Sequence, residues 1–264
     1  MNRNRKQVSY GAPFSNYLGH IALCRENFVI LDNGHNLALV FNIESGKCMA
    51  TIGSPGVGPG AFSSLTGAAF NGRGELYVSD ALLGRIQVFD TSGAYVRLFS
   101  GRVECPHGLA FTLTDDLIVC DGKKNQVRIF DEYGRLACAF GSFGSKPGEF
   151  DGPRAVCVAR DGKIIVTDSG NSRVQIFDCQ GGFLGLIEPF QHPLAVAVGR
   201  GGEIAVVDFH HTSSNVHVYS AVGELLYKIQ CPKEADAGPR GIALDGTGRL
   251  IVAYNNMVDI HQLF

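Results

Sequence analysis

The side chains best suited to chemistry in this chain are cations and flat rings in short polar loops. Adjacent lysines stand in the loop Gly122-Lys123-Lys124-Asn125. Cations in such loops can contact phosphates, and exposed rings can stack on nucleic-acid bases. The candidate phosphate contacts are Lys123, Lys124, Arg154, Arg173, Arg240 and Arg85. The candidate rings are Phe209, Tyr254, His35, His107 and His210.

Several of these residues have an equally simple structural interpretation. Arg85 and Arg173 each follow a strand-ending aspartate by five residues, so each could pair with that acid instead of a phosphate. Phe209 could be a packing residue, and the two lysines could be ordinary solvated surface. The sequence leaves these alternatives open. The aspartates are predicted to cap turns rather than to act as catalysts, and they are Asp80, Asp121, Asp168 and Asp208.

The pattern argues against an enzyme and against a bound metal or other cofactor. Adjacent histidines such as His210 and His211 rarely bind one ion, and spacing supplies no third ligand. The eight cysteines form no CxxC pair, so we expect intracellular free thiols. His20 is the only metal-binding side chain expected where the innermost strands begin, and no acid accompanies it. We therefore expect a binding protein without a cofactor.

An internal repeat organises the whole chain. One motif of alternating apolar residues, an aromatic residue and a final polar residue recurs roughly every 41 to 48 residues, which is typical of propeller blades. Its copies are Ala38-Leu39-Val40-Phe41-Asn42, Ile86-Gln87-Val88-Phe89-Asp90, Val127-Arg128-Ile129-Phe130-Asp131, Val174-Gln175-Ile176-Phe177-Asp178 and Val216-His217-Val218-Tyr219-Ser220. Each unit divides into four short alternating runs separated by turn residues, which predicts four antiparallel strands.

Small residues predict where the axis lies. The first run of each unit is centred on Ala or Cys, and these residues are Ala22, Ala69, Ala110, Cys157, Ala197 and Ala243. Sheets converge near a propeller axis, so small side chains fit there. Six such runs imply six blades. The sixth unit ends after its third run, and residues near 5 to 11 match the missing fourth.

We therefore predict one all-β domain over residues 1–264, a six-bladed β-propeller with four antiparallel strands per blade. The N-terminal strand is expected to close the ring, which removes a free sheet edge. The expected blades span residues 17–53, 65–100, 106–141, 153–188, 193–230 and 239–264 plus 5–11.

The units resemble the NHL repeat. The resemblance rests on Pro153 to Val158, Asp161 to Asp168 and Asn171 to Phe177, and it is strong in the second to fourth units. The first unit departs from the pattern at Leu37, and the sixth has Tyr254 where an aspartate is expected. A six-bladed NHL propeller is similar to the C-terminal domain of TRIM-NHL proteins.

That resemblance implies a role in post-transcriptional regulation, including translational repression, through binding of single-stranded or hairpin RNA in messenger RNA. It also implies protein partners on the same face. A substrate-recognition module of a ubiquitin ligase is the alternative, because Leu82, Leu83 and Met257 also stand in these loops. The chain has no RING, B-box or coiled-coil pattern, so no ligase activity is expected of it.

Charge should be polarised between the two faces, although the formal net charge is only −2. The loops between second and third strands contain no acid, whereas the opposite turns are rich in acids and also carry Arg160 and Arg200. No apolar stretch approaches the roughly 18 residues of a membrane span, and Met1 to Lys6 lacks the core of a signal peptide. We expect a cytoplasmic, monomeric domain without a membrane partner.

Overall fold

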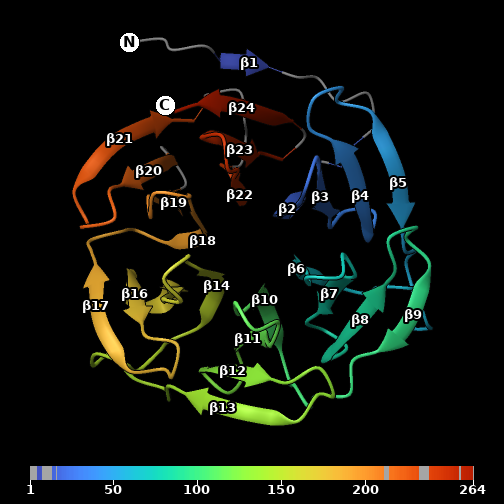
Figure 1. Ribbon diagram of the computed structural model, residues 1–264, viewed down its shortest axis with the longest axis horizontal. Coiled ribbons are helices and arrows are strands. Elements are labelled where there is room, and N and C mark those ends of the chain that lie inside the picture. Colours follow the sequence, from blue (N-terminus) through green and yellow to red (C-terminus); the bar gives the residue numbers. More distant parts are fainter. Residues whose placement is uncertain are drawn as a thin grey trace.

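Six four-stranded antiparallel sheets surround a central axis in the computed structural model, which confirms the predicted all-β propeller (Figure 1). The structure describes residues 5–7, 14–15, 17–210, 214–231, 238–255 and 257–263. In the first five blades the strands follow chain order from the axis outward. They are β2 (Leu18–Cys24), β3 (Asn27–Asp32), β4 (Leu37–Asn42) and β5 (Cys48–Ile52); β6 (Leu65–Phe70), β7 (Leu76–Asp80), β8 (Arg85–Phe89) and β9 (Tyr95–Leu98); β10 (Pro106–Phe111), β11 (Leu117–Asp121), β12 (Gln126–Phe130) and β13 (Leu136–Phe140); β14 (Pro153–Val158), β15 (Ile164–Asp168), β16 (Arg173–Phe177) and β17 (Phe183–Ile187); β18 (Pro193–Val198), β19 (Ile204–Asp208), β20 (Asn215–Tyr219) and β21 (Leu225–Gln230). A short 3-10 helix, η1 (Ser169–Asn171), follows β15.

The sixth blade is built from both ends of the chain. It contains β22 (Gly241–Leu244), β23 (Arg249–Ala253) and β24 (Val258–Gln262), and its outer strand is β1 (Arg5–Gln7). β1 runs antiparallel to β24, with Lys6 opposite Ile260 (Figure 1). The predicted closure by the N-terminal strand is therefore confirmed for residues 5–7, while residues 8–11 lie outside the described part of the chain.

Removing the closing strand is expected to destabilise the propeller. Deletion of residues 1–11 leaves the outer edge of β24 without its partner strand, and exposed edges pair with other molecules. We expect a markedly lower melting temperature or aggregation, measured by circular dichroism and light scattering during heating. A truncated protein that melts at the temperature of the full chain and stays monomeric would show that β1 contributes nothing to closure.

The repeated aromatic residues of the sequence motif form the packing between blades. Phe41, Phe89, Phe130 and Phe177 are each at most 1% exposed, at the ends of the third strands. The Phe150 and Phe177 ring centroids lie 5.5 Å apart, and equivalent pairs occur in the second and third blades, Phe62 with Phe89 and Phe99 with Phe130. Burying a phenylalanine contributes about 1.5–3 kcal/mol, so the motif that reveals the repeat also stabilises it.

The innermost strands approach one another closely around the axis. The strands that carry the small central residues are β2, β6, β10, β14, β18 and β22, and they ring the centre in Figure 1. A methyl group placed on Gly67 of β6 would lie 2.2 Å from the carbonyl oxygen of His107 in β10. Small residues are therefore required at this junction.

Within the described ranges no helix is long and apolar enough to cross a membrane.

Candidate nucleic-acid interface

One face of the ring gathers the loops that the sequence singled out. We call it the top face: it comprises the loops between second and third strands and the lead-in segments before each first strand. Backbone hydrogen bonds join the two sets, as from Gly122 N–H to the Cys105 carbonyl (2.9 Å) and from Gly170 N–H to the Asp151 carbonyl (2.8 Å). The predicted sharing of one face is thus confirmed by direct contacts.

In the first five blades a buried aspartate holds the lead-in segment against the end of the second strand. Asp168 accepts a hydrogen bond from Asp151 N–H (2.8 Å), and Asp80 accepts from Ser63 N–H (2.9 Å). The strand-ending aspartates are at most 8% exposed, and they are Asp32, Asp80, Asp121, Asp168 and Asp208. These carboxylates serve turn structure, as predicted for Asp80, Asp121, Asp168 and Asp208, because each accepts hydrogen bonds from backbone N–H groups of the lead-in segment.

Arg173 is a structural residue, so the structure removes it from the accessible cations. It is 6% exposed, and its Nε donates to Asp168 Oδ2 over 2.8 Å. The remaining guanidinium nitrogens donate to the carbonyls of Ser145, Lys146 and Glu149 at 2.8–2.9 Å. Of the two roles that the sequence left open, pairing with the aspartate is the one that the geometry supports, because a buried, saturated guanidinium cannot reach a phosphate.

Arg85 repeats this arrangement in the second blade. Its guanidinium donates to the carbonyls of Val57, Gly58 and Ala61 at 2.7–3.1 Å, and its Nε lies 3.9 Å from Asp80 Oδ2. The side chain is 17% exposed. Arg85 therefore ties down the connector from the preceding blade, and it too is removed as a phosphate contact.

In the third blade Arg128 takes the place of Arg85 and Arg173, although it stands two residues later in the strand. The sequence analysis did not identify this contact. The Arg-x-Gln order of the second and fourth blades is reversed to Gln126-Val127-Arg128. Arg128 Nη1 lies 3.5 Å from Asp121 Oδ2 and donates to the carbonyl of Arg102. The reversed order in the sequence was the available signal.

Lys123 and Lys124 are exposed on the top face, as predicted, but they share an acidic partner. Their side chains are 71% and 46% exposed, and their Nζ atoms lie 3.2 and 2.5 Å from the carboxylate of Glu104. Hydrogen bonds from Lys124 and then Lys123 hold the pKa of Glu104 below its usual value. One acid against two lysines leaves one net positive charge available to an anion.

A ring of equivalent residues lies around the axis on the top face, at the mouth of a cavity. Each stands where an innermost strand begins, and together they line a cavity of about 280 Å³. We call them the mouth ring: Gly19, Thr66, His107, Arg154, Leu194 and Arg240. Two fixed cations from the fourth and sixth blades are thereby brought to one opening.

The two arginines of the mouth ring repel each other, and no acidic side chain among the described residues pairs with them. Partial burial and the positive charge of Arg240 lower the pKa of Arg154; the other charges acting on Arg154 come from Tyr17 and Cys105. In the described part of the chain, neither Arg154 nor Arg240 lies within 4.0 Å of a carboxylate. The buried Nε of Arg240 also has no hydrogen-bond acceptor there. Two arginines of this kind favour the binding of an anionic ligand.

Aromatic rings flank the same guanidinium. The Arg240 carbon Cζ lies 4.3 Å from the Tyr17 ring centroid and 5.7 Å from that of Phe209. Tyr17 is 44% exposed and Phe209 is half-buried. Phe209 thus stays among the candidate rings, and Tyr17 joins it. Tyr17 was not found from sequence, although an aromatic residue directly before the first strand was a visible signal.

The histidines at the mouth are neutral near pH 7. Desolvation and the charge of Arg154 lower the pKa of His107 to about 4, and desolvation alone lowers that of His20 to about 4. His107 Nε2 lies 3.7 Å from Cys105 Sγ. The positive charge of the cavity therefore comes from its arginines, and His107 can offer only a neutral ring or a hydrogen bond.

His35 and His210 lie on other top-face loops. His35 Nδ1 is 3.0 Å from Asp32 Oδ2, and the imidazole is half-exposed. His210 is half-buried, and its backbone N–H donates to Ser214 Oγ over 3.1 Å. Both flank the loops around the mouth ring rather than lining its cavity.

Tyr254 does not belong to the interface, and the stacking role predicted for it is wrong. It is 0% exposed and packs among Val207, Leu250 and Leu263. The sixth blade has this tyrosine where the other blades have a buried aspartate, so the ring occupies core space at that position. A buried ring cannot stack on a base.

Metal binding finds no support in the described ranges. No group of three or more histidine, cysteine, aspartate or glutamate side chains could hold an ion there. All eight cysteines are free thiols, and burial raises the pKa of Cys231 to about 12.

Two family models match parts of the chain. The model described as NHL repeat matches residues 150–177, and the model described as 6-bladed beta-propeller matches residues 15–100. Both matches fall on units whose strand order and closure are described above.

Several curated proteins match this chain over part of their own length. Protein brain tumor of Drosophila melanogaster is 32% identical over 143 residues, covering 53% of this chain and 14% of that protein. B-box type zinc finger protein ncl-1 of Caenorhabditis elegans is 30% identical over 141 residues, covering 50% and 16%. Human E3 ubiquitin-protein ligase TRIM32 is 30% identical over 129 residues, covering 42% and 19%. The matched stretch is thus less than a fifth of each of these relatives.

Solved structures share the fold at much lower identity. A streptogramin B lyase superposes with a TM-score of 0.72 at 12% identity, covering 97% of this chain and 96% of the lyase. A putative gluconolactonase gives a TM-score of 0.73 at 15% identity, covering 98% and 91%. At these identities the likeness concerns the propeller architecture alone.

Proposed function

Because this chain is an NHL-repeat β-propeller that resembles the propeller domain of TRIM-NHL proteins, we propose that its top face binds single-stranded or hairpin RNA. The relatives support an interaction module, and RNA is the partner that the top-face chemistry favours. We infer from this a platform for post-transcriptional regulation, with messenger RNA as its ligand. One observation carries the proposal: Arg154 and Arg240 share a channel mouth in which the described residues supply no carboxylate.

Phosphate is the anion that this arrangement suits best. Guanidinium groups offer forked donors that match phosphate oxygens. Among the described residues no aspartate or glutamate balances the positive charge of Arg154 and Arg240, so a phosphate group would balance it. Lys123 and Lys124 extend the positive path across the third blade. These four cations replace the larger set expected from sequence, since Arg85 and Arg173 are committed to the fold.

Bases have flat surfaces to contact on the same side. Tyr17 and Phe209 border the Arg240 guanidinium, so a nucleotide at the mouth would meet a cation and a ring together. Combined stacking and phosphate contacts are typical of proteins that bind single strands. In the described ranges the only helix on the top face is the three-residue η1, too short to read a duplex DNA groove, which favours an unpaired strand or a hairpin loop.

Recognition of a protein partner on this face is the second candidate, because Leu82 is 74% exposed in the loop between β7 and β8. Two curated relatives, TRIM32 and NHLRC1, are E3 ubiquitin-protein ligases, and a substrate segment could occupy the same surface. Salt separates the candidates, since a phosphate-dominated complex weakens steeply with salt and an apolar peptide interface far less.

Replacing Lys123 and Lys124 together by Ala is expected to flatten the salt dependence of RNA binding. Each phosphate contact on a single strand contributes about −0.7 to the slope of log affinity against log salt, so the double variant should lose about one unit. The change is less than two full contacts because Glu104 already neutralises part of the pair. Fluorescence polarisation with a labelled RNA selected from a random pool measures the slope.

The matched control is His107→Asn. His107 is uncharged near pH 7, so this variant should keep the wild-type salt slope even where it alters affinity. A slope that is unchanged in the lysine variant, or reduced equally in the His107 variant, would count against phosphate contacts at the third blade.

A further inference from the structure

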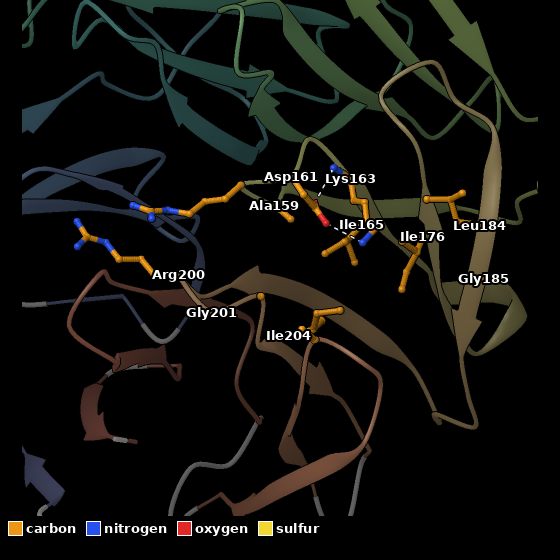
Figure 2. Close-up of a pocket in the computed structure, with 13 residues that line it drawn as sticks. Ala159, Asp161, Lys163, Ile165, Ile176, Leu184, Gly185, Arg200, Gly201 and Ile204 are labelled. Atoms are coloured by element: carbon orange, nitrogen blue, oxygen red, sulfur yellow. Dashed lines mark hydrogen bonds and ion pairs between the residues drawn. The ribbon is translucent and has the colours of Figure 1, made fainter.

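A groove opens on the bottom face between the fourth and fifth blades, away from the mouth ring (Figure 2). The bottom face is the side of the ring that carries the turns between the first and second strands of each blade. The groove encloses about 410 Å³ and is lined by both blades. Figure 2 shows Arg200 on one side of it, with Ile165, Ile176 and Leu184 on the other.

The groove exists because the outer parts of these two blades fit loosely. At other junctions the turn between third and fourth strands presses on the preceding blade. A methyl group on Gly93 would lie 2.9 Å from Ile52, and one on Gly181 would lie 2.4 Å from Phe140. At the equivalent turn of the fifth blade, a methyl group on Gly223 would meet no atom within 4 Å.

A glycine in the outer strand of the fourth blade deepens the groove. Gly185 lies in β17 opposite Ile176, where every other equivalent outer-strand position has a side chain: Ala50 in β5, Arg97 in β9, Cys138 in β13 and Tyr227 in β21. A methyl group on Gly185 would also meet nothing within 4 Å, and its φ is not in the left-handed region. The glycine is therefore not required by the backbone. It leaves Ile176 and Leu184 accessible as an apolar wall.

The charge at the rim is unbalanced. Arg160 and Arg200 are both exposed, and in the described part of the chain neither has a carboxylate within 4.0 Å. The acid that lines the groove, Asp161, is already paired with Lys163 at 2.6 Å. Two arginines beside an aliphatic wall complement a ligand that carries carboxylates next to an aliphatic side chain.

We propose that this groove binds a short acidic peptide segment of a partner protein, with an aliphatic residue against Ile176 and Leu184 and carboxylates on Arg160 and Arg200. The lining contains no aromatic residue on which a base could stack, which favours a peptide over RNA. This site lies on the opposite face from the proposed RNA surface, so the propeller could hold both ligands at once.

The test uses a random peptide library displayed on phage, selected on the 264-residue protein. Enriched peptides should combine Asp or Glu with Leu, Ile or Val. A synthetic enriched peptide should bind at least about tenfold more weakly to Gly185→Leu, which fills the groove, and to the Arg160→Glu/Arg200→Glu double variant. Ala137→Leu, at an exposed position of β13, controls for added apolar surface, and Lys123→Ala/Lys124→Ala controls for lost charge on the top face.

Three results would overturn the proposal. They are enrichment of the same peptides on Gly185→Leu as on the wild type, enrichment of basic instead of acidic peptides, and a selected single-stranded RNA whose affinity falls with Gly185→Leu but not with Lys123→Ala/Lys124→Ala. The last would make the groove an RNA site. If Gly185→Leu lowers the melting temperature, the double arginine variant decides alone, since both its residues are exposed.

Discussion

Replacing Arg154 and Arg240 together by Gln is expected to lower RNA affinity on the order of 100-fold at fixed salt. A hydrogen bond to a charged group contributes about 1.5–3 kcal/mol, and losing two such contacts at the lower value costs about 3 kcal/mol. The variant should remain folded, because the described residues give neither guanidinium a carboxylate partner to abandon. Affinity is measured by polarisation with the same labelled RNA and stability by thermal unfolding.

Two companion variants show whether the effect is local. Arg154→Lys/Arg240→Lys retains charge and should recover part of the affinity, but not the forked phosphate contacts. Arg160→Glu/Arg200→Glu alters charge on the bottom face and should leave RNA binding nearly unchanged. If the bottom-face variant weakens RNA as much as the mouth-ring variant does, long-range charge rather than contact explains binding, and the assignment of the mouth ring is wrong.

Replacing Arg173 by Ala is expected to destabilise the propeller by about 3–5 kcal/mol, which would be the largest stability effect of a single candidate residue. The change leaves the buried Asp168 carboxylate without its cation and removes donors to three carbonyls in the connector between blades. Urea unfolding followed by circular dichroism measures the loss. Lys123→Ala, an exposed change, should stay within about 0.5 kcal/mol of the wild type.

The same variants separate structure from binding. Arg173→Ala protein that is still folded at low temperature should bind RNA with wild-type affinity per folded molecule, since the side chain is buried. A variant that is fully stable but loses RNA would instead restore the phosphate role that the sequence left open for Arg173.

The propeller was predictable because its sequence signal is also its packing. Phe89, Phe130 and Phe177 recur at blade spacing, and they recur because each fills the same inter-blade space. The closing strand was predictable for the same reason, since a unit lacking one strand must obtain it elsewhere in the chain. The spacing of the repeated residues was therefore sufficient to predict the six-bladed propeller.

The interface was only partly predictable, because the type of a residue does not determine whether its side chain is exposed to solvent. Arg173 and Lys123 look alike as loop cations, but a nearby buried aspartate draws the first inward and leaves the second in solvent. Tyr254 stands at a position expected to lie in a loop. It replaces the strand-ending aspartate of the other blades, and its ring is buried in the hydrophobic core. The mouth ring joins Arg154 and Arg240 across non-adjacent blades, and only ring closure shows that they meet.

The most direct test of RNA binding on the top face is the affinity of a selected single-stranded RNA as salt rises from about 50 to about 200 mM. Two arginine contacts at about −0.7 each and about −1 from the lysine pair predict a slope of about −2.4, which is a loss of roughly 30-fold across this range. The Arg154→Gln/Arg240→Gln variant should show about half that slope. No detectable binding at the lowest salt, or a wild-type slope near zero, would contradict RNA recognition by these four cations.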